Sequence, residues 1–155
     1  MIQPLREPDR ARWTELWRAY LQFYRTTLPD DQYAHTWSRL MQGTALHGLA
    51  AHDGQRIVGI AHFLFHPSCW TMTDVCYLQD LYVDDAVRGQ GTGRALIEAV
   101  AAAAREREAA RLYWTTQDHN AAARTLYDKL AKHSGFIRYD WGRLATRFTG
   151  CREGA

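Results

Sequence analysis

The sequence has no long uncharged hydrophobic run. Its most hydrophobic stretch, Leu96 to Ala104, already contains Glu98, whereas a membrane-spanning helix needs roughly 18 or more consecutive apolar residues. The first residues, Met1 to Glu7, lack the apolar segment of a secretory signal. We therefore expect neither a membrane span nor a signal for secretion.

An excess of charge of one sign is also missing. Lys and Arg together number 19, and Asp and Glu together number 17, which leaves a net charge of +2. A balance this even does not indicate nucleic acid or an anionic membrane surface as a partner. We therefore expect neither nucleic acid nor a membrane as a partner.

Cysteines are few, and their spacing forms no motif. There are three of them, Cys69, Cys76 and Cys151, with no Cys-x-x-Cys. An odd number without paired spacing predicts a reducing, cytoplasmic location rather than a disulfide framework. His62 and His66 precede the first two cysteines, but the tight paired spacing of a structural zinc site is missing, so we expect no metal.

The composition is that of a globular protein. Of the 155 residues, 46% are apolar and 23% are charged, which argues against disorder. The length predicts one domain over residues 1–155, and the sequence contains no repeat, low-complexity segment or linker.

Apolar residues at steps of three and four predict amphipathic helices. The first of these helices carries six such residues (Trp13, Leu16, Trp17, Tyr20, Leu21 and Tyr24). Further helices are expected over about residues 30–43, from the glycine-rich segment to Ala104, and over about 118–132. The aromatic residues of the first helix, with Trp37, are typical of a core stripe, and the alternative is an aromatic wall for a cationic acceptor.

Strand patterns alternate with these helices. Asp53-Gly54 separates two apolar runs, which is a strong hairpin signal. The expected strands, including this hairpin, cover residues 2–5, 46–51, 55–66, 75–83, 112–116, 136–141 and 144–148. Because strands and helices interleave, the predicted class is a mixed α/β (α+β) fold in one domain.

The sharpest feature is a glycine-rich segment, Arg88 to Arg94, between a strand and a long helix. Glycines let a ligand approach the backbone closely, and a helix start offers free N–H groups, so the segment suits a phosphate or pyrophosphate. It is not a P-loop, because no Lys follows the glycines. It is not a Rossmann fingerprint either, because Arg94 or Leu96 stands where the last Gly or Ala belongs.

Arg88-Gly89-Gln90-Gly91-Thr92-Gly93 resembles motif A of the GNAT superfamily, the acetyl-CoA-dependent N-acetyltransferases. The strand before it, residues 77–83, and the later segments 114–120, 123–127 and 134–136 resemble neighbouring parts of the same family. The resemblance covers about residues 77–141 and is nearest the spermidine/spermine acetyltransferases and the Hpa-type histone and polyamine acetyltransferases. It implies a central twisted mixed sheet of about six to seven strands flanked by about four helices.

The resemblance also implies acetyl-CoA as cosubstrate and a set of residues that bind it. These residues lie on the strand, on the glycine-rich segment and at the next helix start (Leu81, Tyr82, Val83, Arg88, Gly89, Gln90, Gly91, Thr92, Gly93, Arg94 and Asn120). For Asn120, a plain helix cap is an equal explanation.

Acetyl transfer to an amine needs a proton donor for the leaving thiolate and a way to remove a proton from the amine. By resemblance Tyr127 is the donor, although its helical spacing also fits a core tyrosine. The spermidine/spermine branch has Glu where this chain has Gln79, which cannot take a proton. Asp80 is the neighbouring candidate base, but it faces the other side of the strand unless a bulge intervenes. Three alternatives remain: Asp74 is the base, a residue of the first two helices is the base, or the reaction has no dedicated base.

We therefore expect an N-acetyltransferase that moves an acetyl group from acetyl-CoA to a primary amine by direct attack in a ternary complex. The acceptor is a polyamine, a protein lysine or a small amino compound, and family habit predicts a homodimer. The alternative is a non-catalytic acyl-CoA-binding or sensing module on the same fold, which the Gln at position 79 favours.

Overall fold

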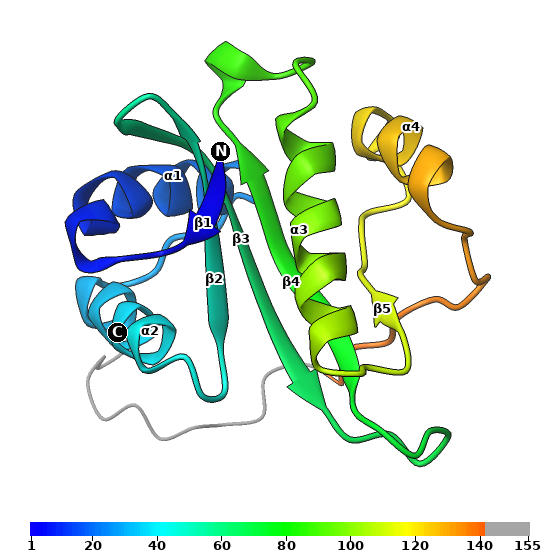
Figure 1. Ribbon diagram of the computed structural model, residues 1–155. Coiled ribbons are helices and arrows are strands. Elements are labelled where there is room, and N and C mark those ends of the chain that lie inside the picture. The colour runs from blue at the N-terminus through cyan, green and yellow to red at the C-terminus, as the bar shows by residue number, and fades with distance from the viewer. Residues whose placement is uncertain (142–155) are drawn as a thin grey trace, which may run out of the picture. The chain divides into compact units, whose positions relative to one another are not determined.

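A five-stranded sheet forms the centre of the computed structural model, which describes residues 1–141 of the chain (Figure 1). The strands follow one another in chain order across the sheet: β1 (Ile2–Pro4), β2 (His47–Asp53), β3 (Arg56–His66), β4 (Val75–Val83) and β5 (Leu112–Tyr113). The first four strands pair antiparallel, and β5 runs parallel to β4. The expected hairpin at Asp53-Gly54 is confirmed as the turn between β2 and β3.

Helices cover both faces of this sheet. Helices α1 (Arg10–Phe23) and α2 (Asp30–Gln42) lie on one face, and α3 (Thr92–Glu106) lies on the other (Figure 1). Two short 3-10 turns, η1 (Glu7–Asp9) and η2 (Asp85–Val87), precede α1 and the glycine-rich segment. None of the helices described is long and apolar enough to cross a membrane.

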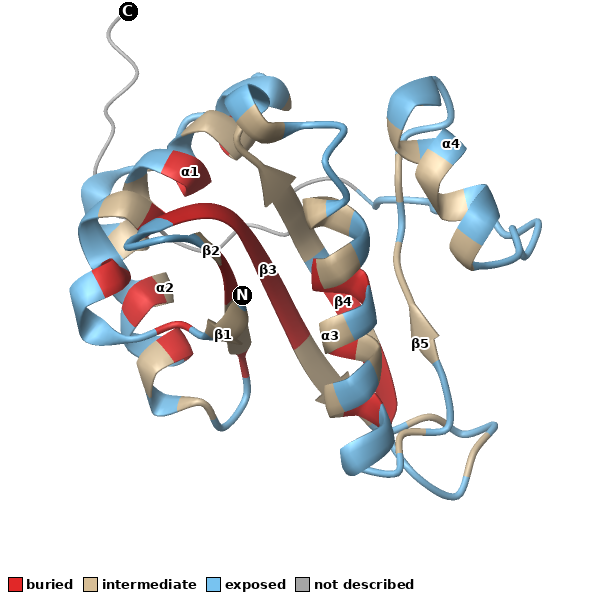
Figure 2. Ribbon diagram, turned by 45° about the horizontal axis from the view of Figure 1, so that its top comes forward, coloured by how far each residue is buried: buried red, intermediate tan, exposed pale blue. Residues whose placement is uncertain are grey.

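The main core lies between the sheet and the helices α1 and α2. Figure 2 shows the buried turns of both helices and the buried length of β3. The core consists mainly of the aromatic and aliphatic residues predicted from the helical spacing, with strand residues opposite them (Trp13, Leu16, Trp17, Leu21, Trp37, Leu40, Ala50, Ile57 and Ile60). Burial of these side chains, worth about 1.5–3 kcal/mol for each large one, fixes the helices on the sheet.

On the opposite face, one glycine lets α3 approach the sheet closely. A Cβ atom at Gly59 would lie 3.1 Å from Leu96 Cδ1 and 3.1 Å from the Tyr82 carbonyl oxygen. Because both distances are shorter than ordinary van der Waals contact, only glycine fits there without displacement. Gly59 therefore sets how close the glycine-rich segment and the start of α3 lie to β4.

The chain divides into two compact units, residues 1–119 and residues 120–155. The first unit holds the sheet and the helices α1 to α3. The second unit holds α4 (Ala121–Leu130), which begins at the side-chain cap of Asn120.

The expected number of strands was too high for the part of the chain that is described. Residues 136–141 form no strand, although their apolar residues alternate as in a strand, and the expected strand 144–148 lies outside the described residues. The strand after α3 is also shorter than expected, because only Leu112 and Tyr113 pair with β4. The alternation of apolar residues predicts which face of a strand each side chain lies on. The strand itself forms only where a partner strand completes its hydrogen bonds.

Candidate functional site

The glycine-rich segment forms an open turn at the start of α3. Gly89 has φ 81° and Gly91 has φ 86°, which is the left-handed region that glycine adopts without strain. A Cβ atom at either position would meet no atom within 4 Å, so the backbone is open to an approaching ligand. The first hydrogen bond of the helix runs from the Ala95 N–H to the Gly91 carbonyl. The N–H groups of residues 92–94 therefore take no part in the hydrogen bonds within the helix. An anion site at a helix start requires such N–H groups.

The two arginines at the ends of this segment are both paired with carboxylates. Arg88 Nη2 lies 2.7 Å from Asp85 Oδ1, and its guanidinium stacks on the Tyr82 ring at 5.4 Å. Arg94 Nε lies 2.7 Å from Glu98 Oε1. These pairs are largely exposed, so each is weak in water and a phosphate can displace it.

Beyond its first residues, β4 has a free edge beside this segment. It pairs with β5 only at Cys76 and Tyr77, whereas its pairing with β3 continues as far as Val83. In the described chain, Leu81, Tyr82 and Val83 thus have a strand partner on one side only. An open strand edge presents backbone groups to an extended ligand, which is the use expected for these three residues.

Asp84 anchors the turn between β4 and the glycine-rich segment. Its side chain accepts a hydrogen bond from the Ala86 N–H and ion pairs with Arg12 of α1 and, at 3.1 Å, with Arg56 of β3. The backbone hydrogen bond of Ala86 and the Arg12 guanidinium lower the pKa of Asp84, against the opposing effect of burial. Sequence reasoning missed this anchor, because its members are far apart in the chain.

A β-bulge in β4 settles which way Asp80 faces. On β3, His62 pairs with Asp80, but the next residue, Phe63, pairs with Leu78, so Gln79 is the additional residue. The bulge reverses the alternation, and Asp80 therefore shares the α1 face of the sheet with its ladder partner His62. The bulge that Asp80 needs as a candidate base is therefore present, and Gln79 is exposed.

Asp80 belongs to a hydrogen-bonded chain that begins in the core. Trp13 Nε1 donates to His62 Nε2 over 2.9 Å, and His62 Nδ1 lies 3.1 Å from Asp80 Oδ2. The Trp13 and His62 side chains are fully buried, whereas the Asp80 side chain is 12% exposed. The sequence alone does not reveal this role of His62, since neither spacing nor motif connects it with Trp13 and Asp80.

Two tyrosines, Tyr20 of α1 and Tyr24 just after the last residue of α1, stand at the outer end of this chain. Burial raises the pKa of Tyr20, and the negative charge of Asp80 and hydrogen bonds with Asp80 and Tyr24 act in the same direction. Burial likewise raises the pKa of Tyr24, whereas its hydrogen bond with Tyr20 lowers it and the negative charge of Asp80 raises it. Both hydroxyls therefore keep their protons throughout the physiological range and act as donors.

The aromatic residues of the first two helices divide between core and site. Trp13, Trp17 and Trp37 are buried, as the core reading predicts. Tyr20 and Tyr24 are half-buried, with ring centroids 5.0 Å apart beside Asp80. Of the five aromatic residues named in the prediction, Tyr20 and Tyr24 are the two that fit the alternative of a wall for a cationic acceptor.

Tyr127 and Asn120 belong to the second compact unit. Asn120 Oδ1 accepts from the Ala123 N–H over 3.3 Å, so the helix cap is confirmed. Tyr127 lies on α4 and is half-buried. Its role as an acid stays a prediction.

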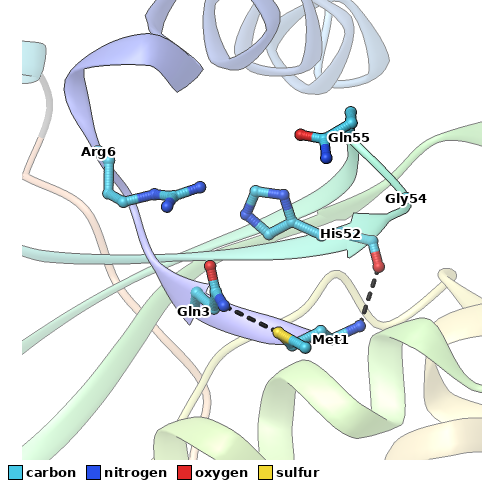
Figure 3. A pocket seen from close by; sticks show the side chains of 6 residues that line it. All are labelled: Met1, Gln3, Arg6, His52, Gly54 and Gln55. Carbon is cyan, nitrogen blue, oxygen red and sulfur yellow. Dashed lines mark hydrogen bonds between the residues drawn. The ribbon is translucent and has the colours of Figure 1, made fainter.

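Other places in the described residues carry less chemistry. No group of three or more metal-ligating side chains occurs among residues 1–141. A hollow of about 390 Å³ lies where β1 meets the β2–β3 turn (Figure 3). None of the expected site residues lines it (it is lined by Met1, Gln3, Arg6, His52, Gly54 and Gln55).

Comparison with known proteins agrees with this arrangement. Residues 11–131 match the model of the Acetyltransferase (GNAT) family. The chain is 33% identical over 142 residues to the D-amino-acid N-acetyltransferase HPA3 of Saccharomyces cerevisiae, covering 90% of this chain and 88% of that protein. It is 30% identical over 104 residues to the thialysine N-epsilon-acetyltransferase of Caenorhabditis elegans, covering 64% of each.

A solved structure extends the likeness to the fold. The ribosomal-protein-alanine N-acetyltransferase from Brucella melitensis biovar Abortus 2308 superposes with a TM-score of 0.76 at 28% identity. The superposition covers 90% of this chain and 96% of that one.

Proposed function

Because this chain belongs to the GNAT acetyltransferase family, we propose that it transfers the acetyl group of acetyl-CoA to the primary amine of a small amino compound, with Asp80 as the proton acceptor. Membership makes it an acetyl-CoA-dependent N-acetyltransferase. The choice of acceptor and the role of each residue are our proposal.

The observation that carries the proposal is that Asp80 and the glycine-rich segment are parts of one strand-loop-helix element. The bulge directs the Asp80 carboxylate toward Tyr20 and Tyr24, and the same strand leads through the Asp84 anchor into Gly89 and Gly91. The proposed proton acceptor and the segment that would bind the cosubstrate are thereby held on one rigid scaffold, which favours direct attack.

The glycine-rich segment would hold the pyrophosphate of CoA through the N–H groups of residues 92–94. The open space above Gly89 and Gly91 and the positive φ angles fit such a close approach. Backbone groups of Leu81, Tyr82 and Val83 would hold the extended part of the cosubstrate along the free edge of β4. Bound there, acetyl-CoA supplies an activated acyl group as its thioester.

The reaction then needs two proton transfers, one away from the amine nitrogen and one to the leaving sulfur. The amine nitrogen attacks the thioester carbonyl carbon, so that a C–N bond forms and the C–S bond breaks. Asp80 takes the proton that the amine loses, directly or through a water molecule, and Tyr127 gives its hydroxyl proton to the leaving sulfur. Both groups return to their starting states by exchange with solvent, and the products are an amide and CoA thiol.

The surroundings of Asp80 support an ammonium group as the recognised feature of the acceptor. A carboxylate beside two half-buried tyrosine rings attracts a primary ammonium by charge and by cation–π contact. The relatives named for D-amino acids and thialysine support a small amino compound over a polyamine or a protein lysine.

The test is acetyl-CoA turnover over a panel of amines. CoA thiol release and the N-acetylated product are both measured with D-amino acids, thialysine, a polyamine, a lysine peptide and an aminoglycoside. We expect thiol and product in equal amounts, with the largest kcat/KM for an amino acid. Binding of acetyl-CoA without release for any amine would instead identify an acyl-CoA sensor, and preference for the peptide would refute the small acceptor.

Compartment and assembly complete the proposal. The few cysteines, with Cys69 exposed and Cys76 buried and neither in a disulfide, support a reducing, cytoplasmic location. The resemblance to the family supports a homodimer, which light scattering at micromolar concentration tests directly.

A further inference from the structure

We infer that Trp13 acts as a positioning residue for acetyl transfer by keeping His62 neutral, so that Asp80 keeps its full negative charge for the acceptor amine. The inference rests on the proposed role of Asp80. It assigns a chemical task to the indole N–H of a fully buried tryptophan, which packing alone does not need.

The hydrogen-bond chain allows one tautomer of His62. An indole N–H donates and never accepts, so His62 Nε2, 2.9 Å from Trp13 Nε1, must be the unprotonated ring nitrogen. The ring proton therefore sits on Nδ1 and is donated to Asp80 Oδ2 over 3.1 Å. The three side chains come from α1, β3 and β4, so a helix and two strands of the sheet fix the direction of these hydrogen bonds.

Two neighbours of His62 act on it in opposite directions. The negative charge of Asp80 favours a doubly protonated ring. A second proton on Nε2 would point at the indole N–H of Trp13, and both groups are buried. Burying two donors against each other costs the hydrogen bond and the solvation of a charge. The neutral ring is therefore the stable form in the native protein.

The other groups packed on the ring do not alter this balance. From α1, Trp17 lies edge-on at 4.9 Å and carries no charge. Tyr20 of α1 and Tyr24, which follows the last residue of α1, interact with Asp80, and their raised pKa values keep them neutral donors. Of the groups that face His62 in the described structure, Asp80 alone is charged.

The neutral ring has a consequence for catalysis. A protonated His62 would form an ion pair with Asp80, cancel its charge, and weaken both its hold on an ammonium group and its capacity to take a proton. A neutral Nδ1–H instead orients the carboxylate through one oxygen without cancelling its charge. Trp13 thus acts on the acceptor site through His62.

The test compares Trp13→Phe with Trp17→Phe in the full chain. Both variants replace a buried indole beside His62 with a phenyl ring. Only Trp13→Phe removes a hydrogen bond, because Trp17 Nε1 is buried without a partner. The first readout is the ¹⁵N NMR signal of His62, and the second is kcat/KM against pH with the best amine.

In the wild type we expect the Nδ1–H tautomer, because Trp13 donates to Nε2. In Trp13→Phe, His62 should gain a second proton as the pH falls. The loss of kcat/KM should then be about tenfold or more at pH 6.5 and small at pH 9, since Asp80 is paired only in the acidic range. Trp17→Phe should leave the shape of the profile unchanged.

A wild-type His62 that carries its proton on Nε2, or that titrates in the native protein, would overturn the inference even if Trp13→Phe fails to fold. Parallel pH profiles for the two variants would also overturn it. Failure of the proposed function looks different: Asp80→Asn would then leave kcat/KM unchanged at every pH, while the NMR result would still report the tautomer.

Discussion

Replacing Gly91 by alanine tests where the cosubstrate lies. Gly91 is the N-cap of α3 with φ 86°, and a Cβ atom there would meet no protein atom within 4 Å. The added methyl group therefore disturbs little in the protein itself, yet it stands in the space through which phosphates would reach the N–H groups of residues 92–94. We expect a modest loss of stability and a larger loss of affinity for CoA.

The two effects have separate magnitudes. A non-glycine residue in the left-handed region costs roughly 1–2 kcal/mol, which lowers the melting temperature of a chain this size by about 2–8 °C. Losing one charge-assisted hydrogen bond to a phosphate costs about 1.5–3 kcal/mol more, and only in the complex. The Kd for CoA should therefore rise about tenfold to a hundredfold.

Gly54→Ala is the matched control for this measurement. Gly54 also has a positive φ, 59°, and open space at its Cβ position, but it lies in the β2–β3 turn. Isothermal titration with CoA and thermal unfolding are run on the wild type and both variants. An unchanged Kd for a folded Gly91→Ala protein, equal to that of Gly54→Ala, would show that the phosphates bind elsewhere.

Three further predictions concern other parts of the site. Tyr127→Phe should lower kcat about 10²–10⁴-fold without changing acetyl-CoA affinity, since it removes a proton donor and keeps the ring; steady-state kinetics check it, and a kcat within a few-fold of wild type would make Tyr127 a packing residue. Gly59→Ala should destabilise the protein by about 1–3 kcal/mol through contacts at 3.1 Å with Leu96 and the Tyr82 carbonyl, which urea unfolding measures, and equal stability would mean that α3 shifts freely. The pKa of Asp84 is lowered from its ordinary 3.8, so its contribution to the free energy of unfolding is complete above that pH and is lost as the pH falls through the lower folded value. The stability difference between wild type and Asp84→Asn should therefore shrink only in that acidic range. A difference that stays constant with pH would contradict the role of Asp84 as an anchor.

The local pattern of the sequence predicted most of the fold. Steps of three and four from Trp13 marked α1, Asp53-Gly54 marked the β2–β3 turn, and the glycines before Leu96 marked the start of α3. Each of these signals depends on neighbours within a few residues. The strand expected at 136–141 failed because pairing depends on a distant partner that alternation does not identify.

The candidate site was predictable only in part, for the same physical reason. The glycine-rich segment is contiguous and could be found from the sequence, and two of its glycines have positive φ angles. The Trp13–His62 hydrogen bond joins residues 49 positions apart, and the Asp84 anchor joins β4 to α1 and β3. The direction of Asp80 depended on one extra residue in a strand, which changes the face of every residue after it.

The most direct test of the account is the pH dependence of kcat/KM for wild type and Asp80→Asn with one amine of lysine-like pKa. With Asp80 as proton acceptor, the wild-type profile should flatten well below the pKa of the amine. The variant should instead climb about tenfold per pH unit between about pH 7 and 9, because only the free amine then reacts. Two profiles that climb in parallel over this range would contradict the account, since the amine would lose its proton without any help from Asp80.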